Sequence, residues 1–167
     1  SPKTISGTVL EGSFIFELSD GNGNSIAQTD LSSFYDKPLI FNEKFNIEFD
    51  DYNNDGNLDF TLGQYALNKG KSYRIFTIRP DGTISELAVK DTPELFIIST
   101  EEGFSTKLSK VDDTSFKVRQ YDSDAGKSFE HVYQWKTDKF VIVETREIKE
   151  LEGYQEMMSD DSLLPKD

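Results

Sequence analysis

Apolar and polar residues alternate on both sides of one short acidic loop, and this alternation is the strongest constraint on the fold. Every second residue is apolar before and after the loop: Phe45, Ile47 and Phe49, then Leu58, Phe60 and Leu62. Successive side chains of a β-strand point to opposite faces, so a period of two predicts a strand on each side. The sequence therefore predicts a β-hairpin with the acidic loop at its tip.

Oxygen-bearing side chains occupy alternate positions in this loop: Asp51, Asn53, Asp55, Asn57 and Asp59. Calcium takes six to eight oxygen ligands, and a tight loop can aim positions 1, 3, 5, 7 and 9 at one ion. Such a loop needs a glycine at position 6 for its sharp turn, and Gly56 stands there. We therefore expect a calcium site made of these five residues, with Asn57 contributing its backbone carbonyl.

An ordinary polar turn is the alternative explanation, because Asn, Asp and Gly are common in turns. That alternative accounts for Asp55 and Gly56 but does not require Asp51 and Asp59. The carboxylates of this stretch would also repel one another without a cation, and no basic residue lies among them. The loop is not an ordinary EF-hand, since Leu62 stands where that loop has a bidentate glutamate.

Residues 51–59 form the pattern Asp-x-Asn-x-Asp-Gly-x-x-Asp. At the tip of a β-hairpin, this pattern resembles the calcium-binding loops of integrin-type FG-GAP repeats and of bacterial VCBS-type proteins. The resemblance covers residues 47–62 and their immediate neighbours. It implies a bound Ca²⁺ and a secreted, propeller-like setting, and it implies no particular activity.

The charge balance of the chain bears on its partners. Its 167 residues include 18 basic and 31 acidic ones, which gives a formal net charge of −13. The phosphates of nucleic acids and anionic membrane surfaces would be repelled, so we expect neither as a partner. No apolar run approaches the ~20 residues of a membrane span. We expect a single β-domain over residues 1–150 and an acidic C-terminal tail over residues 151–167, and the oligomeric state stays open.

Two observations favour an extracellular or cell-surface location. The chain begins Ser1-Pro2 without methionine, as expected of a mature or truncated piece whose export signal or lipid anchor has been removed. Extracellular calcium is also concentrated enough to fill a loop with this modest ligand set, whereas cytosolic calcium would fill it poorly. The chain has no cysteine, which excludes disulfides, thiol catalysis and cysteine metal sites.

Most of the remaining sequence also alternates in short runs separated by turn residues. Asp81-Gly82 between two such runs predicts a hairpin. Strands are predicted over these further ranges: two within 5–18, then 73–78, 83–89, 95–99, 103–108, 116–121, 129–135 and 140–145. Helical turns are expected only near residues 31–35 and 154–158. About ten short strands predict an all-β, mainly antiparallel fold, as a barrel, a sandwich or a propeller-like sheet.

The same alternation predicts the buried side chains of these strands. They are Phe45, Ile47, Phe49, Phe60, Tyr73, Ile75, Val132, Trp135, Phe140 and Ile142.

The sequence predicts no catalytic residues. His131, the only histidine, lies on a predicted strand with Tyr133 and Trp135 on its own face, which favours aromatic packing over general-base catalysis. We expect an exported binding module for an unknown protein or glycan. An inhibitor or immunity-type protein that meets a basic partner is the specific hypothesis, because of the net negative charge. The alternative is a polysaccharide or peptide hydrolase in which calcium has a structural role.

Overall fold

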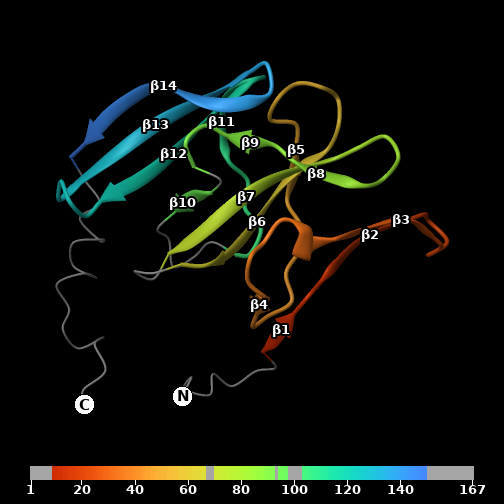
Figure 1. Ribbon diagram of the computed structural model, residues 1–167. Coiled ribbons are helices and arrows are strands. Elements are labelled where there is room, and N and C mark those ends of the chain that lie inside the picture. Colours follow the sequence, from red (N-terminus) through yellow and green to blue (C-terminus); the bar gives the residue numbers. More distant parts are fainter. Residues whose placement is uncertain (1–8, 67–69, 93, 98–102, 150–167) are drawn as a thin grey trace, which may run out of the picture.

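The computed structural model describes residues 9–66, 70–92, 94–97 and 103–149. Its strands stack in three layers, with a central sheet between a pair of N-terminal two-stranded sheets and a long C-terminal sheet (Figure 1). One helical turn interrupts the strands. The prediction of an all-β, mainly antiparallel fold is confirmed, and the stacked open sheets correspond to the sandwich-like alternative.

The N-terminal layer consists of two short antiparallel pairs. In the first pair, β1 (Leu10–Gly12) lies against β4 (Leu39–Phe41). In the second, β2 (Ile15–Ser19) and β3 (Ser25–Asp30) form a hairpin. The 3₁₀ turn η1 (Leu31–Ser33) follows, which confirms the helical turn expected near residue 31.

The central sheet has the order β10-β7-β6-β5, and β8 adds to β7. Its strands are β5 (Phe49–Asp50), β6 (Asp59–Tyr65), β7 (Lys71–Ile78), β8 (Ile84–Glu86) and β10 (Leu95–Ile97). The β5–β6 hairpin carries the acidic loop at its tip, and β7–β8 turns at Asp81-Gly82, so both predicted hairpins are confirmed.

The C-terminal sheet has the order β11-β12-β13-β14-β9. Its strands are β9 (Ala88–Val89), β11 (Ser109–Asp112), β12 (Ser115–Asp122), β13 (Lys127–Lys136) and β14 (Lys139–Ile148). All of its pairs are antiparallel except that of β14 with β9. In Figure 1, the ends of β12, β13 and β14 reach past β10 and the rest of the central sheet.

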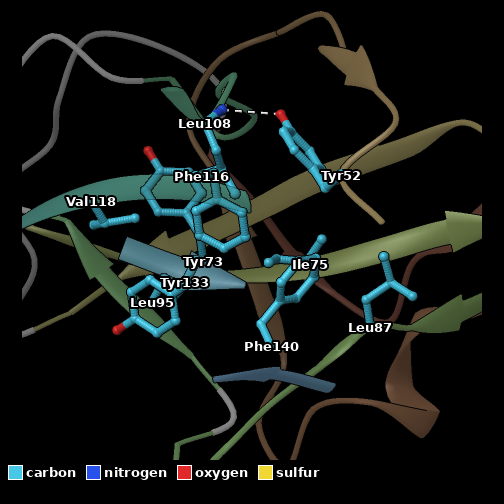
Figure 2. Packing of buried hydrophobic residues seen from close by; sticks show 10 residues of the cluster. All are labelled: Tyr52, Tyr73, Ile75, Leu87, Leu95, Leu108, Phe116, Val118, Tyr133 and Phe140. Carbon is cyan, nitrogen blue, oxygen red and sulfur yellow. Dashed lines mark hydrogen bonds between the residues drawn. The ribbon is translucent and has the colours of Figure 1, made fainter. Parts of the chain in front are cut away.

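Two hydrophobic cores lie on opposite faces of the central sheet. The core toward the C-terminal sheet, drawn in Figure 2, contains Tyr52, Tyr73, Ile75, Leu87, Leu95, Leu108, Phe116, Val118, Tyr133 and Phe140. The core toward the N-terminal layer contains Leu31, Leu39, Phe41, Phe60, Leu62, Phe76, Ile84 and Phe104. Because both faces of β6 are covered, five consecutive residues of this strand are buried rather than every second one.

Gly63 in β6 is required by close packing inside the first of these cores. It faces Tyr73 across the β6–β7 ladder, and a Cβ at Gly63 would lie 2.5 Å from Cε1 of that ring. The Tyr73 hydroxyl in turn donates a hydrogen bond to the Gly103 carbonyl at 2.6 Å. The glycine thus lets the tyrosine lie flat on its own sheet and reach the segment that follows β10.

The strands predicted over residues 45–49 and 103–108 are largely wrong. Only Phe49–Asp50 pairs with β6, and residues 103–108 form no regular strand. Thr61 explains both results: its hydroxyl donates to the Thr106 carbonyl at 2.7 Å and accepts from the Thr106 amide at 2.8 Å. The Gly63 amide also donates to the Phe104 carbonyl at 2.7 Å. This edge of β6 is therefore occupied, and residues 45–47 have nothing to pair with.

The predicted core is right in part. Phe60, Tyr73, Ile75 and Phe140 are buried. Four others are half-buried: Phe45, Ile47, Val132 and Trp135. Two predictions are wrong, since Phe49 is 37% exposed on the short edge strand β5 and Ile142 is 48% exposed. Ile142 lies beyond the pairing of β14 with β9, which ends at Phe140.

The predicted helical turn at 154–158, the tail over 151–167 and the first residues of the strand pair expected within 5–18 lie outside the described residues. In the part of the chain that the structure describes, no helix has the length and apolar character needed to span a membrane.

Candidate functional site

The acidic loop connects β5 to β6 and carries its oxygen-bearing side chains at the tip of this hairpin. Asp50 pairs with Asp59 at the base of the hairpin. Two residues in the loop have positive φ, Asn54 at 58° and Gly56 at 81°. Such left-handed backbone suits Gly and Asn and curls the loop back toward its own base.

Backbone amides of the loop donate to its carboxylates. The Gly56 amide donates to Asp51 Oδ2 at 2.9 Å, and the Asn57 amide donates to Asp55 Oδ1 at 2.8 Å. The Asn53 side-chain amide donates to Asp55 Oδ2 at 3.0 Å. A carboxylate oxygen has more than one lone pair, so each of these oxygens keeps the capacity to contact a cation as well.

Asp59 differs from the rest of the loop because its side chain is buried in the protein. Its residue is 0% exposed, and its Oδ2 accepts a hydrogen bond from the Tyr52 amide at 2.7 Å. Its other oxygen, Oδ1, is buried with no hydrogen-bond partner of good geometry, and so is the hydroxyl of Thr77, the residue opposite on β7. A buried unpaired carboxylate oxygen is costly, and a bound cation is one way to satisfy it.

The electrostatics of Asp59 follow from this burial. The pKa of Asp59 is raised to about 6, mainly by loss of solvent and to a smaller extent by the charges of Asp55 and Asp51, while hydrogen bonds from Thr77 and the Tyr52 amide oppose the shift. Asp55 is exposed and shows the opposite direction, with its pKa lowered by hydrogen bonds from Asn57 and Asn53 although partial burial raises it. The charges of Asp51 and Asp55 therefore act on Asp59, whose buried carboxyl holds its proton more tightly than the exposed carboxyl of Asp55.

The side chains that the sequence predicted as ligands occupy one loop, but they do not form a closed cage of carboxylates. Within the described ranges, no three His, Cys, Asp or Glu side chains converge in a way that could hold a metal ion. Calcium also accepts amide and backbone carbonyl oxygens. The carboxylates of Asp51, Asp55 and Asp59 do not form a metal site by themselves, and a calcium ion there would also need the Asn53 side chain and the Asn57 carbonyl as ligands.

Tyr52 fixes the loop to the rest of the molecule, and nothing in the local pattern predicted this. Its ring is 1% exposed and packs edge-on against Phe116 of β12, with the ring centroids 5.8 Å apart. Its hydroxyl accepts a hydrogen bond from the Leu108 amide at 3.0 Å, as Figure 2 shows. The same residue holds Asp59 through its amide, so the loop is tied to the core on the C-terminal sheet.

Lys110 of β11 is a second residue that the sequence did not predict. Its Nζ donates to the Asp51 carbonyl at 2.6 Å and lies 3.5 Å from the Asp50 carboxylate. From the sequence we assumed that no basic residue offsets the negative charge of these carboxylates. The structure corrects that assumption, because a lysine from another sheet relieves part of the repulsion at the base of the loop.

Two hollows of more than 400 Å³ are among those that lie away from the loop. One is an apolar groove of about 470 Å³ between the N-terminal layer and the central sheet, lined by phenylalanines that include Phe14, Phe45 and Phe60. The other is a hollow of about 440 Å³ under the far end of the C-terminal sheet. His131 lines this second hollow, and its ring stacks at 6.1 Å on Phe129 and meets Tyr133 edge-on at 6.4 Å. The predicted aromatic packing of His131 is confirmed for Tyr133.

Comparisons with protein-family models, with curated proteins and with solved structures found no match for this chain. A function for this protein therefore has to be inferred from the chemistry of these sites.

Proposed function

We propose that the chain is a binding module whose loop over residues 51–59 holds a structural calcium ion. One observation carries the proposal: the buried Asp59 carboxylate has an oxygen without a hydrogen-bond partner of good geometry, at the end of the loop that contains Asp51 and Asp55. The ligand oxygens would come from Asp51, Asn53, Asp55 and Asp59, with the Asn57 backbone carbonyl. Calcium tolerates such a mixed and irregular set, whereas magnesium demands a tight octahedron and keeps its waters.

The same proposal includes export from the cell. Loops of extracellular modules bind calcium with dissociation constants of about 10⁻⁴ to 10⁻³ M, which suits extracellular and not cytosolic concentrations. The net charge of −13 suits a basic partner, as an inhibitor or immunity-type protein would meet. The part of the chain that the structure describes offers no site for the hydrolase alternative. Within it, burial raises the pKa of two carboxyls: Asp59 belongs to the loop and Glu86 pairs with Arg74 at 3.3 Å, and neither lines the groove or the hollow.

Calcium should stabilise this domain without being required for folding. At ten times the dissociation constant, a single bound ion contributes about RT ln 11, or roughly 1.4 kcal/mol, to the folded state. For a domain of this size that corresponds to a melting temperature a few degrees higher. The hydrophobic cores on the two faces of the central sheet should keep the domain folded when a chelator removes calcium.

Calorimetric titration at pH 7 tests this proposal. We expect one calcium site with much weaker binding of magnesium, and its loss in the double variant Asp51→Ala/Asp55→Ala. The matched control is Asp20→Ala/Asp81→Ala, since these two aspartates accept backbone amides in other turns at 2.8 to 2.9 Å. An unchanged isotherm in the loop variant, or equal losses in both double variants, would contradict the proposal.

A further inference from the structure

Among the described residues, the inner face of the C-terminal sheet is covered only near one end. Near the β13–β14 turn it packs on the central sheet through residues such as Phe116 and Phe140. Toward the other end the strands continue past β10 (Figure 1), and Ile142 on this face is half exposed. The hollow of about 440 Å³ lies under this overhanging end.

Strand register explains why chemically useful side chains gather there. His131 of β13 pairs with Val118 and with Thr145, and Phe129 pairs with Gln120, so these residues share the inner face. The hollow is lined by Gln120, Tyr121, Asp122, Phe129, His131 and Thr145. Five of these six side chains carry a hydrogen-bonding group, and none is aliphatic. A lipid or an apolar peptide segment would remove these polar groups from water, which is unfavourable.

The described residues that line the hollow also include no lysine or arginine. Burial lowers the pKa of His131, so its imidazole is neutral at pH 7, and its Nδ1 lies 2.9 Å from the Thr145 hydroxyl. The nearby cations of the sheet are engaged elsewhere. Glu130 holds Lys117, Arg119 and Arg146 at 3.6, 3.2 and 2.7 Å, and Glu147 holds Lys127 at 2.9 Å. Phosphates, sulfates and nucleotides therefore find no charged partner in the hollow.

Aromatic rings provide a flat surface beside these polar groups. The Phe129 and His131 rings are nearly parallel, with an interplanar angle of 22°. The face of an aromatic ring is electron-rich. It therefore attracts the weakly positive C–H groups on the face of a sugar ring, whose hydroxyls can then bond to amide, carboxylate and hydroxyl groups at the rim. A neutral molecule with one C–H face and many hydroxyls matches this arrangement.

We infer that this hollow is a saccharide-binding site, in which a sugar ring stacks on Phe129 and hydrogen-bonds to Gln120, Asp122 and Thr145. The inference rests on the proposal that the chain is a binding module, and it specifies the ligand class and the place. The site is built from β12, β13 and β14 and shares no residue with the calcium loop.

The single histidine of the chain gives a direct readout, because its imidazole has one set of NMR signals. The probes are maltohexaose, cellohexaose and chitohexaose, each titrated to 10 mM, with inorganic phosphate as the anionic comparison. We expect at least one oligosaccharide to shift the His131 signals in a saturable way and phosphate to leave them unchanged. Phe129→Ala should weaken the binding at least tenfold, and Thr145→Val about three- to fivefold through the loss of one hydrogen bond.

Glu144→Gln is the matched control, since Glu144 is exposed and pairs with Val132, whose neighbours Glu130 and Lys117 lie on the opposite face of the sheet. This variant should bind as the unchanged protein does. Thr145→Val keeps the size of an exposed strand residue, so it remains informative if Phe129→Ala does not fold. The inference is overturned if no oligosaccharide shifts the His131 signals, if phosphate shifts them more strongly, or if binding survives both Phe129→Ala and Thr145→Val.

Repeating the titration in calcium and in a chelator separates the two proposals. Saccharide binding without any calcium site would overturn only the role of the loop. Calcium binding without a saccharide-dependent shift would overturn only the inference about the hollow.

Discussion

The loop over residues 20–24 and the loop over residues 51–58 are both rich in Asp, Asn and Gly. They differ in whether the carboxylates find hydrogen-bond donors within the loop. In the first loop, Asp20 Oδ1 accepts the amides of Asn22 and Asn24 at 2.8 and 2.9 Å, and its Oδ2 accepts the Asn24 side chain at 3.0 Å. The carboxylate is exposed, and the hydrogen bonds from Asn24 lower its pKa. This loop satisfies its own charge.

The second loop depends on a carboxylate from outside the turn. Asp59 is the first residue of β6, and both faces of that strand are covered. Water therefore cannot satisfy Asp59 Oδ1, and the loop amides that reach Asp51 and Asp55 do not reach this atom. Composition alone therefore does not distinguish a polar turn from a candidate metal loop. The distinguishing feature is a buried acid at the end of the following strand.

The largest loss of stability is expected when the packing of β6 is disturbed. Phe60→Ala should lower the free energy of unfolding by about 3–5 kcal/mol, because the ring is 1% exposed between Phe16 and Phe76. Phe16→Ala on β2 should cost about 1–2 kcal/mol, since Phe16 is only half-buried. Urea unfolding measures both. Equal losses would mean that the acidic loop is anchored no better than the N-terminal hairpin.

The second effect concerns the charge of Asp59 in metal-free buffer. The folded-state pKa of about 6 lies above the value of about 3.9 expected in the unfolded chain. The buried acid therefore stabilises the fold fully below pH 4, and this contribution is lost as the pH rises through 6. Asp59→Asn keeps an acceptor for the Tyr52 amide and removes the charge. At pH 7 it should raise metal-free stability by about 2–3 kcal/mol and abolish calcium binding.

Urea unfolding at pH 4, 5, 6 and 7, with metal removed, measures the difference between the two proteins. Asp20→Asn is the control with the opposite sign, because hydrogen bonds lower the pKa of Asp20 in the folded state. Its stabilising contribution should be present at neutral pH and lost in acid. Parallel pH curves for the unchanged protein and Asp59→Asn would show that the charge on Asp59 does not matter to the fold.

The sequence predicted the features that depend on neighbouring residues. The period of two gave most strands, and Asp81-Gly82 and the acidic stretch gave two hairpin turns, because pleat and turn chemistry are local. The wrong strand at 103–108 and the shortened one at 45–49 depend on a long-range contact. Thr61 and Thr106 lie 45 residues apart. No local pattern reveals that the Thr61 hydroxyl forms hydrogen bonds with both the carbonyl and the amide of Thr106.

The candidate site was predictable to the same extent. Alternating oxygen-bearing residues and a glycine at the sixth position are visible in the sequence, and in the structure loop amides donate to Asp51 and Asp55. Tyr52 looked like another residue of the hairpin, and Lys110 is 59 residues away from the carbonyl that it contacts. The burial of Asp59, on which the calcium proposal depends, follows from a second sheet covering β6 and therefore needs the whole fold.

The smallest change in stability is expected when the glycine of either loop, Gly23 or Gly56, is replaced by alanine. Gly23 and Gly56 have φ values of 83° and 81°, and a Cβ on either would meet nothing within 4 Å. Alanine should therefore cost each loop about 1 kcal/mol from backbone strain alone. The two variants should melt alike in a chelator. In 10 mM calcium they should differ, because the Gly56 amide orients Asp51 at 2.9 Å, whereas the Gly23 amide donates to the Asp20 carbonyl at 3.0 Å. We expect Gly23→Ala to keep the few degrees of stabilisation by calcium and Gly56→Ala to lose most of it.

Thermal unfolding with and without calcium measures the shift in melting temperature that calcium causes in each variant. Equal shifts in both variants would mean that the acidic loop is an ordinary turn.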